Sequence, residues 1–416
     1  RSHTVGQLHT GLKSRIPTPR HQSLPFTAQI AAAFDMERLG THATRHGQSG
    51  QGGITRHRVI YLDGRNDINQ GIQLGFAIRL RQAGKVVGQD GLCLRRRLGQ
   101  GVWRAGHGFD LGIGILFPNL SVGGERDQAM NSIAPVWDGN ETWLVLGGGG
   151  LFAAFPLAYA IILPATYPLI IAMLLGLVFR GVAFEFRWRD PRHRPFWDVA
   201  FSFGSVLAAF SQGITLGAIL QGVRVEADAY AGGWLDWLSA FSLLTGAAVV
   251  IGYALLGAAW LVWKTEGPGQ ERARRLAFWL GGATLLALFA VSAATPFLTY
   301  DYWRRWFAMP GVLLTAQVPL LVAICAATFF WSLKRGAERL PFIMALGLFF
   351  LGFVGLGISI YPYVVPRAVT IWDAAAPPQS QLFMLAGAAV IIPIILGYTA
   401  WAYWVFRGKV GTHGYH

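Results

Sequence analysis

The sequence is poor in cysteine and in charged residues, and both shortages exclude classes of protein. Only two cysteines, Cys93 and Cys325, occur in 416 residues, so the chain has neither a disulfide framework nor a Cys-x-x-Cys metal motif. Charged residues make up 13% of the chain, whereas soluble domains carry about 25%. With 53% hydrophobic residues and 16 tryptophans, the composition predicts a polytopic membrane protein.

Positive charge is concentrated in one part of the chain. The formal net charge is +14. Residues 1–107 hold 16 Lys and Arg against 5 Asp and Glu, a net +11, and the remainder holds 19 against 16, a net +3. A basicity confined to one segment is not a nucleic-acid signal for the whole protein, so we expect no nucleic-acid partner.

The chain changes character at Gly108. Residues 1–107 are rich in Arg and His, and neither helical nor strand periodicity persists in them. We interpret 1–107 as a basic non-membrane segment that is either disordered or the product of a shifted reading frame or misplaced start. A basic arm, a targeting peptide and a small extra domain are the alternatives. Residues 108–416 are predicted to form one transmembrane domain.

Long apolar runs fill the second part of the chain. The run 143–185 has 43 residues and would be about 65 Å long as one helix, about twice a bilayer core. We therefore expect it to reverse at "PATYP" (164–168). Eight full spans are expected, at 143–163, 166–184, 197–221, 237–263, 276–297, 311–333, 341–362 and 382–406. A ninth apolar segment, 108–120, is too short to cross alone.

Lys and Arg in the short loops predict the orientation of the spans. The cytoplasmic side is expected to hold the loops 121–142, 187–195, 264–275 and 333–341 and the tail from Arg407. The basic-poor loops 222–236 and 365–381 should lie outside. The loop 299–309 must also lie outside by alternation, although it carries Arg304 and Arg305.

A few polar residues lie within or beside the apolar runs. They are Asp110, Asp138, Asn140, Glu141, Arg180 and Glu185. An ionisable group at membrane depth must face the bundle interior, find a partner or line water. Arg180 and Glu185 lie near the end of one span, with Arg180 about one turn deeper. An acid and an arginine that can reach each other across spans form either a structural ion pair or part of a proton path. Asp138 could instead cap a helix, with Glu141 at the third helical position.

Ligands for haem are scarce in the spans. After residue 107 the histidines are His193 in a basic loop and His413 and His416 in the tail. The methionines of the spans are few, namely Met173, Met344 and Met384. We therefore expect no haem or metal bound by this chain alone. Two functions remain open: a cofactor-free subunit of a respiratory complex that scaffolds a partner and carries protons, and a secondary transporter.

Three motifs resemble subunit II of the cytochrome bd-type quinol oxidases. They are "GFDLGIGILFP" (108–118), "MNSIAPVWDGNETWLVLGGGGLFAAFPLAYA" (130–160) and "FRGVAFEFR" (179–187). The segments 360–381 and 393–410 extend the resemblance to the carboxyl end, and "WDAAAPPQSQ" is similar to the cyanide-insensitive branch.

The resemblance implies an all-α polytopic bundle of nine transmembrane helices in the bacterial inner membrane, with a cytoplasmic C-terminus. It implies a heterodimer with a haem-bearing subunit I that holds haems b558, b595 and d. The complex would oxidise quinol and reduce O2 to water with protons from the cytoplasm, and no catalytic residue would lie in this subunit. A structural quinone and a small accessory subunit remain open.

The resemblance also implies roles for residues. Asp110, Asp138, Asn140, and Arg180 with Glu185 occupy the matching motif positions and are implied as a proton pathway or quinone contact. One departure is His107, which stands where the family motif has Asp. The apolar first helix is also missing, because Arg95 to Arg97 would be costly to insert. We therefore expect the first of the nine helices to be truncated.

Overall fold

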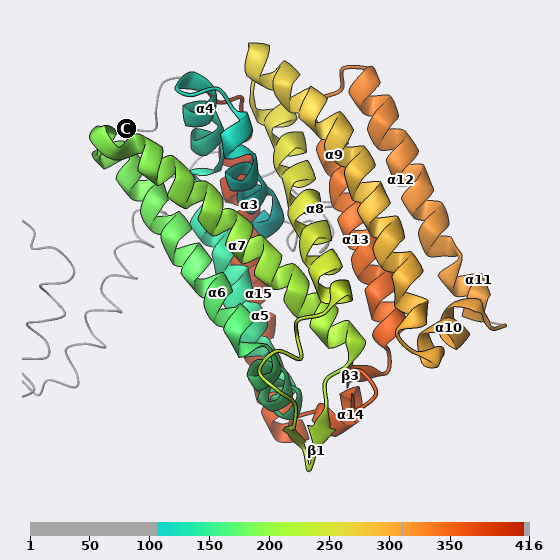
Figure 1. The fold of residues 1–416 in the computed structure, drawn as a ribbon. Helices are drawn as coiled ribbons and strands as arrows, with labels where there is room; N and C mark the ends of the chain where they lie inside the picture. Colours follow the sequence, from blue (N-terminus) through green and yellow to red (C-terminus); the bar gives the residue numbers. More distant parts are fainter. Residues whose placement is uncertain (1–105, 310, 412–416) are drawn as a thin grey trace, which may run out of the picture. The chain divides into compact units, whose positions relative to one another are not determined.

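A computed structural model of the chain describes residues 106–309 and 311–411 (Figure 1). The interpretation of residues 1–107 therefore falls almost wholly outside the described residues. The described part is an all-α transmembrane bundle. Its helices of more than ten residues are α3 (Gly106–Leu116), α5 (Trp137–Ala154), α6 (Pro156–Arg189), α7 (Arg194–Gln221), α8 (Ala240–Lys264), α9 (Gly267–Ala294), α12 (Gln317–Lys334), α13 (Leu340–Ile360) and α15 (Pro378–Val405). These nine helices fit the expected pattern, and the first is short.

Seven described helical segments are long and apolar enough to cross a membrane. Six contain α6, α7, α8, α9, α13 and α15, and the seventh runs through α11 (Gly311–Thr315) and α12. Neither α3 nor α5 is among the seven. Seven of the eight expected full spans are therefore found. The span expected at 143–163 lies mainly in α5, which is excluded because its polar first turns lower its mean hydropathy.

The predicted reversal at 164–168 is also wrong. Pro164 and Pro168 both lie inside the 34-residue α6, as prolines can in membrane helices. The chain breaks instead at Phe155, which has non-helical φ −136° and ψ 64°. Phe155 precedes Pro156, and a residue before proline is disfavoured in the α region, while Pro156 suits the first turn of α6. Because α5 starts at Trp137, its 18 residues already span about 27 Å when they reach this point.

The short helix α3 lies in the centre of the bundle, where it packs against α7 and α8. In turn, α7 packs on α6, α8 on α9, and α13 on α12 and α8 (Figure 1). Glycines permit the closest approach. A Cβ on Gly112 of α3 would lie 1.9 Å from the carbonyl oxygen of Tyr253 in α8, so this contact requires glycine.

The predicted cytoplasmic loops lie together at one end of the bundle, here called the basic end. It contains α4 (Gly124–Ile133), η2 (Pro191–His193), the loops 265–266 and 335–339 and the tail 406–411. Arg187 contacts Asp127 of α4 at 2.6 Å. The side-chain amide of Gln128 donates to the carbonyl oxygen of Val410 at 2.7 Å. The grouping of these loops agrees with the sequence prediction.

Short elements lie at the opposite end: η3 (Thr295–Phe297), α10 (Tyr300–Phe307), α14 (Ile371–Ala374) and the hairpins β1 (Val225–Glu226)–β2 (Ala229–Tyr230) and β3 (Tyr363–Val365)–β4 (Val369–Thr370) (Figure 1). Arg305 donates to the carbonyl oxygen of Ser359 at 2.8 Å, near the end of α13. A cation is favourable at a helix C-terminus, which explains this arginine in a loop predicted to lie outside.

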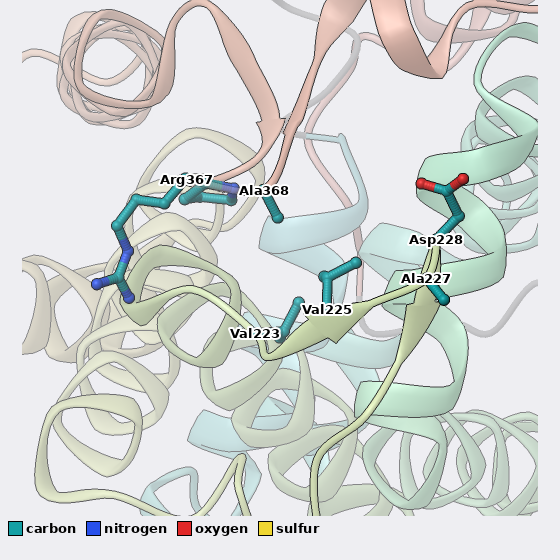
Figure 2. Close-up of a pocket in the computed structure, with 7 residues that line it drawn as sticks. Val223, Val225, Ala227, Asp228, Arg367 and Ala368 are labelled. Atoms are coloured by element: carbon teal, nitrogen blue, oxygen red, sulfur yellow. The ribbon is translucent and has the colours of Figure 1, made fainter.

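The turns of the two hairpins border a shallow depression at this end. Figure 2 places Arg367 and Asp228 on opposite sides of it. The Arg367 guanidinium donates to the carbonyl oxygen of Gln221, so its charge is used to join the end of α7 to the β3–β4 turn.

Candidate functional site

Three helices bring Asp110, Asn140 and Arg180 together inside the bundle. Asp110 lies on α3, Asn140 on α5 and Arg180 on α6. Asn140 Nδ2 donates to Asp110 Oδ2 at 3.3 Å, and Arg180 Nη2 lies 3.7 Å from Asp110 Oδ1. Asp110 and Arg180 are both 0% exposed. Three of the five predicted site residues thus lie together. With Glu141 and Tyr403, described below, they form a group that we call the interior cluster.

Glu141 is the second acid that contacts Arg180 in the interior cluster. Its carboxylate accepts a hydrogen bond from Arg180 Nη1, and its side chain is 21% exposed. The Arg180 guanidinium also lies 5.5 Å from the centre of the Phe201 ring and 5.9 Å from that of Trp137, within cation–π range. One buried arginine therefore faces two acids and two aromatic rings.

The cluster keeps several buried polar atoms without a hydrogen-bond partner. They are Asp110 Oδ1 and the Nε and Nη2 atoms of Arg180. Buried polar groups are nearly always paired with protein or ordered water, and a gap of 3.7 Å between charged atoms is too long for a direct hydrogen bond. The space between Asp110 Oδ1 and Arg180 Nη2 therefore suits a bridging water.

Glycines bring α6 and α7 close enough to bury Arg180. A Cβ on Gly204 of α7 would lie 2.5 Å from the carbonyl oxygen of Gly176 and 3.2 Å from Arg180 Cβ. Any larger residue at 204 would push α7 away from Arg180 and open the cluster to lipid or water.

Asp138 lies outside the interior cluster, on the exposed surface of α5. The N-cap of α5 is Val136, and no side chain caps this helix. The alternative of Asp138 as N-cap with Glu141 at the third position is therefore wrong. Asp138 is in the first turn instead, three residues before Glu141, and residues three apart share a helix face.

Glu185 does not pair with Arg180. Its side chain is 55% exposed and lies 3.8 Å from Arg189, one turn further along α6. Five residues separate Arg180 from Glu185, which turns the two side chains to different faces of a helix with 3.6 residues per turn. The acids that Arg180 meets across the helices are Asp110 and Glu141.

Tyr403 of α15 is a member of the cluster that sequence reasoning missed. Its hydroxyl donates to Asn140 Oδ1 at 3.0 Å. In the sequence it is one of several aromatic residues near the end of the last apolar run, and these fit an interfacial belt equally well. Glu141 was noted in the sequence beside Asp138 and Asn140 but was not among the implied site residues.

Comparison with known proteins identifies the family of this bundle. The sequence model of cytochrome bd terminal oxidase subunit II matches residues 102–406. The chain belongs to this family. Cytochrome bd ubiquinol oxidase subunit 2 of Bacillus subtilis (strain 168) is 30% identical over 320 residues, which cover 73% of this chain and 91% of the relative. Cytochrome bd-I ubiquinol oxidase subunit 2 of Escherichia coli (strain K12) is 30% identical over 340 residues, covering 73% and 90%.

The fold has a solved counterpart as well. The structure of bd oxidase from Geobacillus thermodenitrificans matches with a TM-score of 0.58 and 20% identity, covering 74% of this chain and 95% of that one. As a cytochrome bd subunit II, the chain is part of a quinol oxidase complex, an oxidoreductase in the membrane. The comparisons give no support to the secondary transporter.

Cytochrome bd complexes carry haems, and histidine is a common ligand of haem iron. His193, whose side chain is described, is exposed in the loop after α6, where Nδ1 lies 2.8 Å from Asp190. Within 106–309 and 311–411, no group of three or more His, Cys, Asp and Glu could hold a metal ion. The described part of this subunit II therefore does not fit a haem iron through histidine, and no chemical step is assigned to a haem here.

Proposed function

We propose that this chain scaffolds a haem-bearing partner, subunit I, and helps the complex take up protons from the cytoplasm during quinol oxidation and O2 reduction to water. The observation that carries the proton role is Asp110. It is 0% exposed, and its Oδ1 atom has no hydrogen-bond partner although Arg180 Nη2 lies 3.7 Å away. A buried acid with one free oxygen, stabilised by a cation, is suited to accept and release a proton.

The route proposed to reach Asp110 starts at the basic end. Asp138 is exposed and collects protons from water. Glu141, three residues further along α5, is 21% exposed and paired with Arg180. Asp110 lies behind Arg180 and is fully buried. A proton role fits these residues better than a quinone contact, because enclosed groups at Asp110 and Arg180 offer no surface to a bulky headgroup.

The orientation follows from the loops. The basic end gathers the Lys- and Arg-rich loops and the tail 406–411, and such loops are retained in the cytoplasm. The basic end and the C-terminus are therefore proposed to be cytoplasmic. Asp138 and Glu141 begin α5 at this end, on the side from which the complex would draw its protons.

The scaffold role is proposed for the face formed by α5 and α15. The apolar window of α15 is 0% buried in this chain. Gly147, Gly148, Gly149 and Gly150 of α5 have open space at every Cβ position. Small residues allow close packing of helices in membranes. We assign this face to the haem-bearing partner, because the apolar residues of α15 and the small residues of α5 are left uncovered in this chain.

Asp110→Asn in the assembled complex tests the proton role. Losing the proton-accepting carboxylate should lower quinol-dependent O2 consumption by about 100-fold, the scale of a positioned acid–base group, while the optical spectra of the haems persist. Asp228→Asn, an exposed acid at the opposite end, is the matched control and should retain full turnover. Unchanged turnover in Asp110→Asn, with the complex intact, would exclude a proton route through this residue.

A further inference from the structure

This inference rests on the proposed proton role of Asp110. It concerns how the neighbouring side chains of the interior cluster orient the Asp110 carboxylate. We infer that Tyr403 is a positioning residue for Asp110: by fixing the side-chain amide of Asn140, it commits Asp110 Oδ2 to a hydrogen bond and leaves Oδ1 as the oxygen that exchanges a proton.

The hydrogen bonds run in one direction from α15 to α3. The Tyr403 hydroxyl donates to Asn140 Oδ1 at 3.0 Å, and Asn140 Nδ2 donates to Asp110 Oδ2 at 3.3 Å. An ionised carboxylate only accepts hydrogen bonds, so the amide must turn its nitrogen toward Asp110. The amide oxygen then points to Tyr403, whose hydroxyl is the donor that stabilises this orientation.

Aromatic packing holds the Tyr403 ring independently of its hydroxyl. Its ring centre lies 6.5 Å from that of Phe109 and 6.2 Å from that of Trp260, both in edge-to-face geometry. Phe109 and Trp260 are themselves stacked at 4.2 Å. The ring would therefore keep its place in Tyr403→Phe, and this substitution removes the hydroxyl that donates to Asn140.

The two oxygens of Asp110 consequently have different surroundings. Oδ2 is bound to Asn140 on the side of Tyr403. Oδ1 lies on the side of Arg180, which in turn pairs with Glu141, and it has no hydrogen-bond partner. The free oxygen therefore lies toward the end from which protons are proposed to come. A water bridging Oδ1 and Arg180 Nη2 would complete that connection.

Tyr403 also ties the acid to the proposed partner face. The apolar window of α15 contributes no buried residue, yet Tyr403 joins this helix to the centre of the bundle through Asn140. The cluster therefore includes one side chain from the helix that is proposed to meet the partner.

Tyr403→Phe in the assembled complex is the first test. Turnover at saturating quinol should fall about threefold to tenfold, with an unchanged KM for quinol and unchanged haem spectra. The matched control is Tyr300→Phe, an exposed tyrosine of α10 away from the proposed partner face, which should behave as wild type. Unchanged turnover in Tyr403→Phe overturns the inference.

A double-mutant cycle separates positioning from general damage. If Tyr403 acts through the amide, then Tyr403→Phe should cause no further loss of turnover in an Asn140→Leu background. Independent losses that multiply would overturn the connection through Asn140.

Infrared difference spectra give a readout that does not depend on turnover. The carboxyl band of Asp110, identified by its disappearance in Asp110→Asn, should shift in Tyr403→Phe and stay in place in Tyr300→Phe. An unmoved band in Tyr403→Phe overturns the inference. If Asp110→Asn leaves turnover unchanged while the band still shifts in Tyr403→Phe, the proton route fails but the positioning of Asp110 stands.

Discussion

Two buried clusters of acids and arginines in this chain differ in how completely they are paired. In the interior cluster, Asp110 Oδ1 has no hydrogen-bond partner. In a second cluster at the basic end, here called the end network, Asp198 Oδ2 receives a hydrogen bond from Arg126 at 2.7 Å and Oδ1 receives one from Arg187. Arg187 also binds Asp127 at 2.6 Å. Both oxygens of Asp198 thus accept hydrogen bonds from arginine, whereas one oxygen of Asp110 has no hydrogen-bond partner.

The difference separates structure from function. Arg126 and Arg187 both lie within about 5.5 Å of the Phe117 ring centre, so the end network joins α4, α6, α7 and η1 (Phe117–Asn119) around a shared ring. Every oxygen of Asp198 is engaged, and a fully paired carboxylate has little capacity to exchange protons. The interior cluster leaves hydrogen-bonding capacity unused, which is costly and is typical of functional sites.

The largest effect is expected when the end network is broken. Asp198→Ala removes the acid that pairs two arginines, and leaving a buried charge unpaired costs about 3–5 kcal/mol. The thermal unfolding midpoint and the yield of the complex should fall, while turnover per haem in the surviving complex stays near wild type. Asp190→Ala, which removes a less buried acid of the same region, is the control. Wild-type stability in Asp198→Ala would contradict a structural role for the end network, and the two clusters would then no longer differ in function.

The sequence predicted most of the fold because hydropathy marks membrane helices directly. The ends of α7, α8, α13 and α15 lie within a few residues of the expected spans. The prediction from the sequence failed for the run 143–185. Prolines at 164 and 168 resemble a break, but helix α5 began earlier than its apolar part, and the reversal moved to Phe155.

The candidate site was partly predictable for a related reason. Asp110, Asn140 and Arg180 were identified because polar residues in apolar runs need partners. Which partners they choose depends on helix rotation and packing, which linear spacing does not encode. Glu185 was therefore expected beside Arg180 at the site although it lies on the exposed side of α6, and Tyr403 was indistinguishable from an interfacial aromatic residue.

A smaller effect is expected at the mouth of the proposed route. Asp138→Asn should slow quinol-dependent O2 consumption about fivefold while the haem spectra persist, because Asp138 is exposed and water can partly replace it in delivering protons. Asp138→Glu, which keeps a carboxylate, should recover most of the rate. If the asparagine variant turns over as fast as wild type, Asp138 serves only as a favourable charge in the first turn of α5.

The smallest effect on stability is expected for the tail at the basic end. There Glu338 is paired with Lys409, as the acids of the end network are paired with arginines, but this contact is exposed. Lys409 Nζ lies 2.8 Å from Glu338, and Gln270 donates to the same oxygen at 3.1 Å. These hydrogen bonds, from Lys409 first and Gln270 second, lower the pKa of Glu338 below its ordinary value. The contact therefore stabilises the tail above the ordinary pKa of a glutamate, about 4.3, and is lost as pH falls through the lower pKa of the folded state.

Hydrogen exchange of the tail amides checks this expectation. Protection of residues 406–410, corrected for the intrinsic pH dependence of exchange, should be constant from pH 7 to about pH 5 and decline below pH 4. Glu338→Gln keeps an acceptor for Lys409 but no charge, so its tail should be less protected at pH 7 and lose the acid transition. Glu271→Gln, an exposed acid of α9, should follow wild type. If the acid transition in tail protection survives in Glu338→Gln, another carboxylate causes it. The contact between Lys409 and Glu338 would then not be what holds the tail.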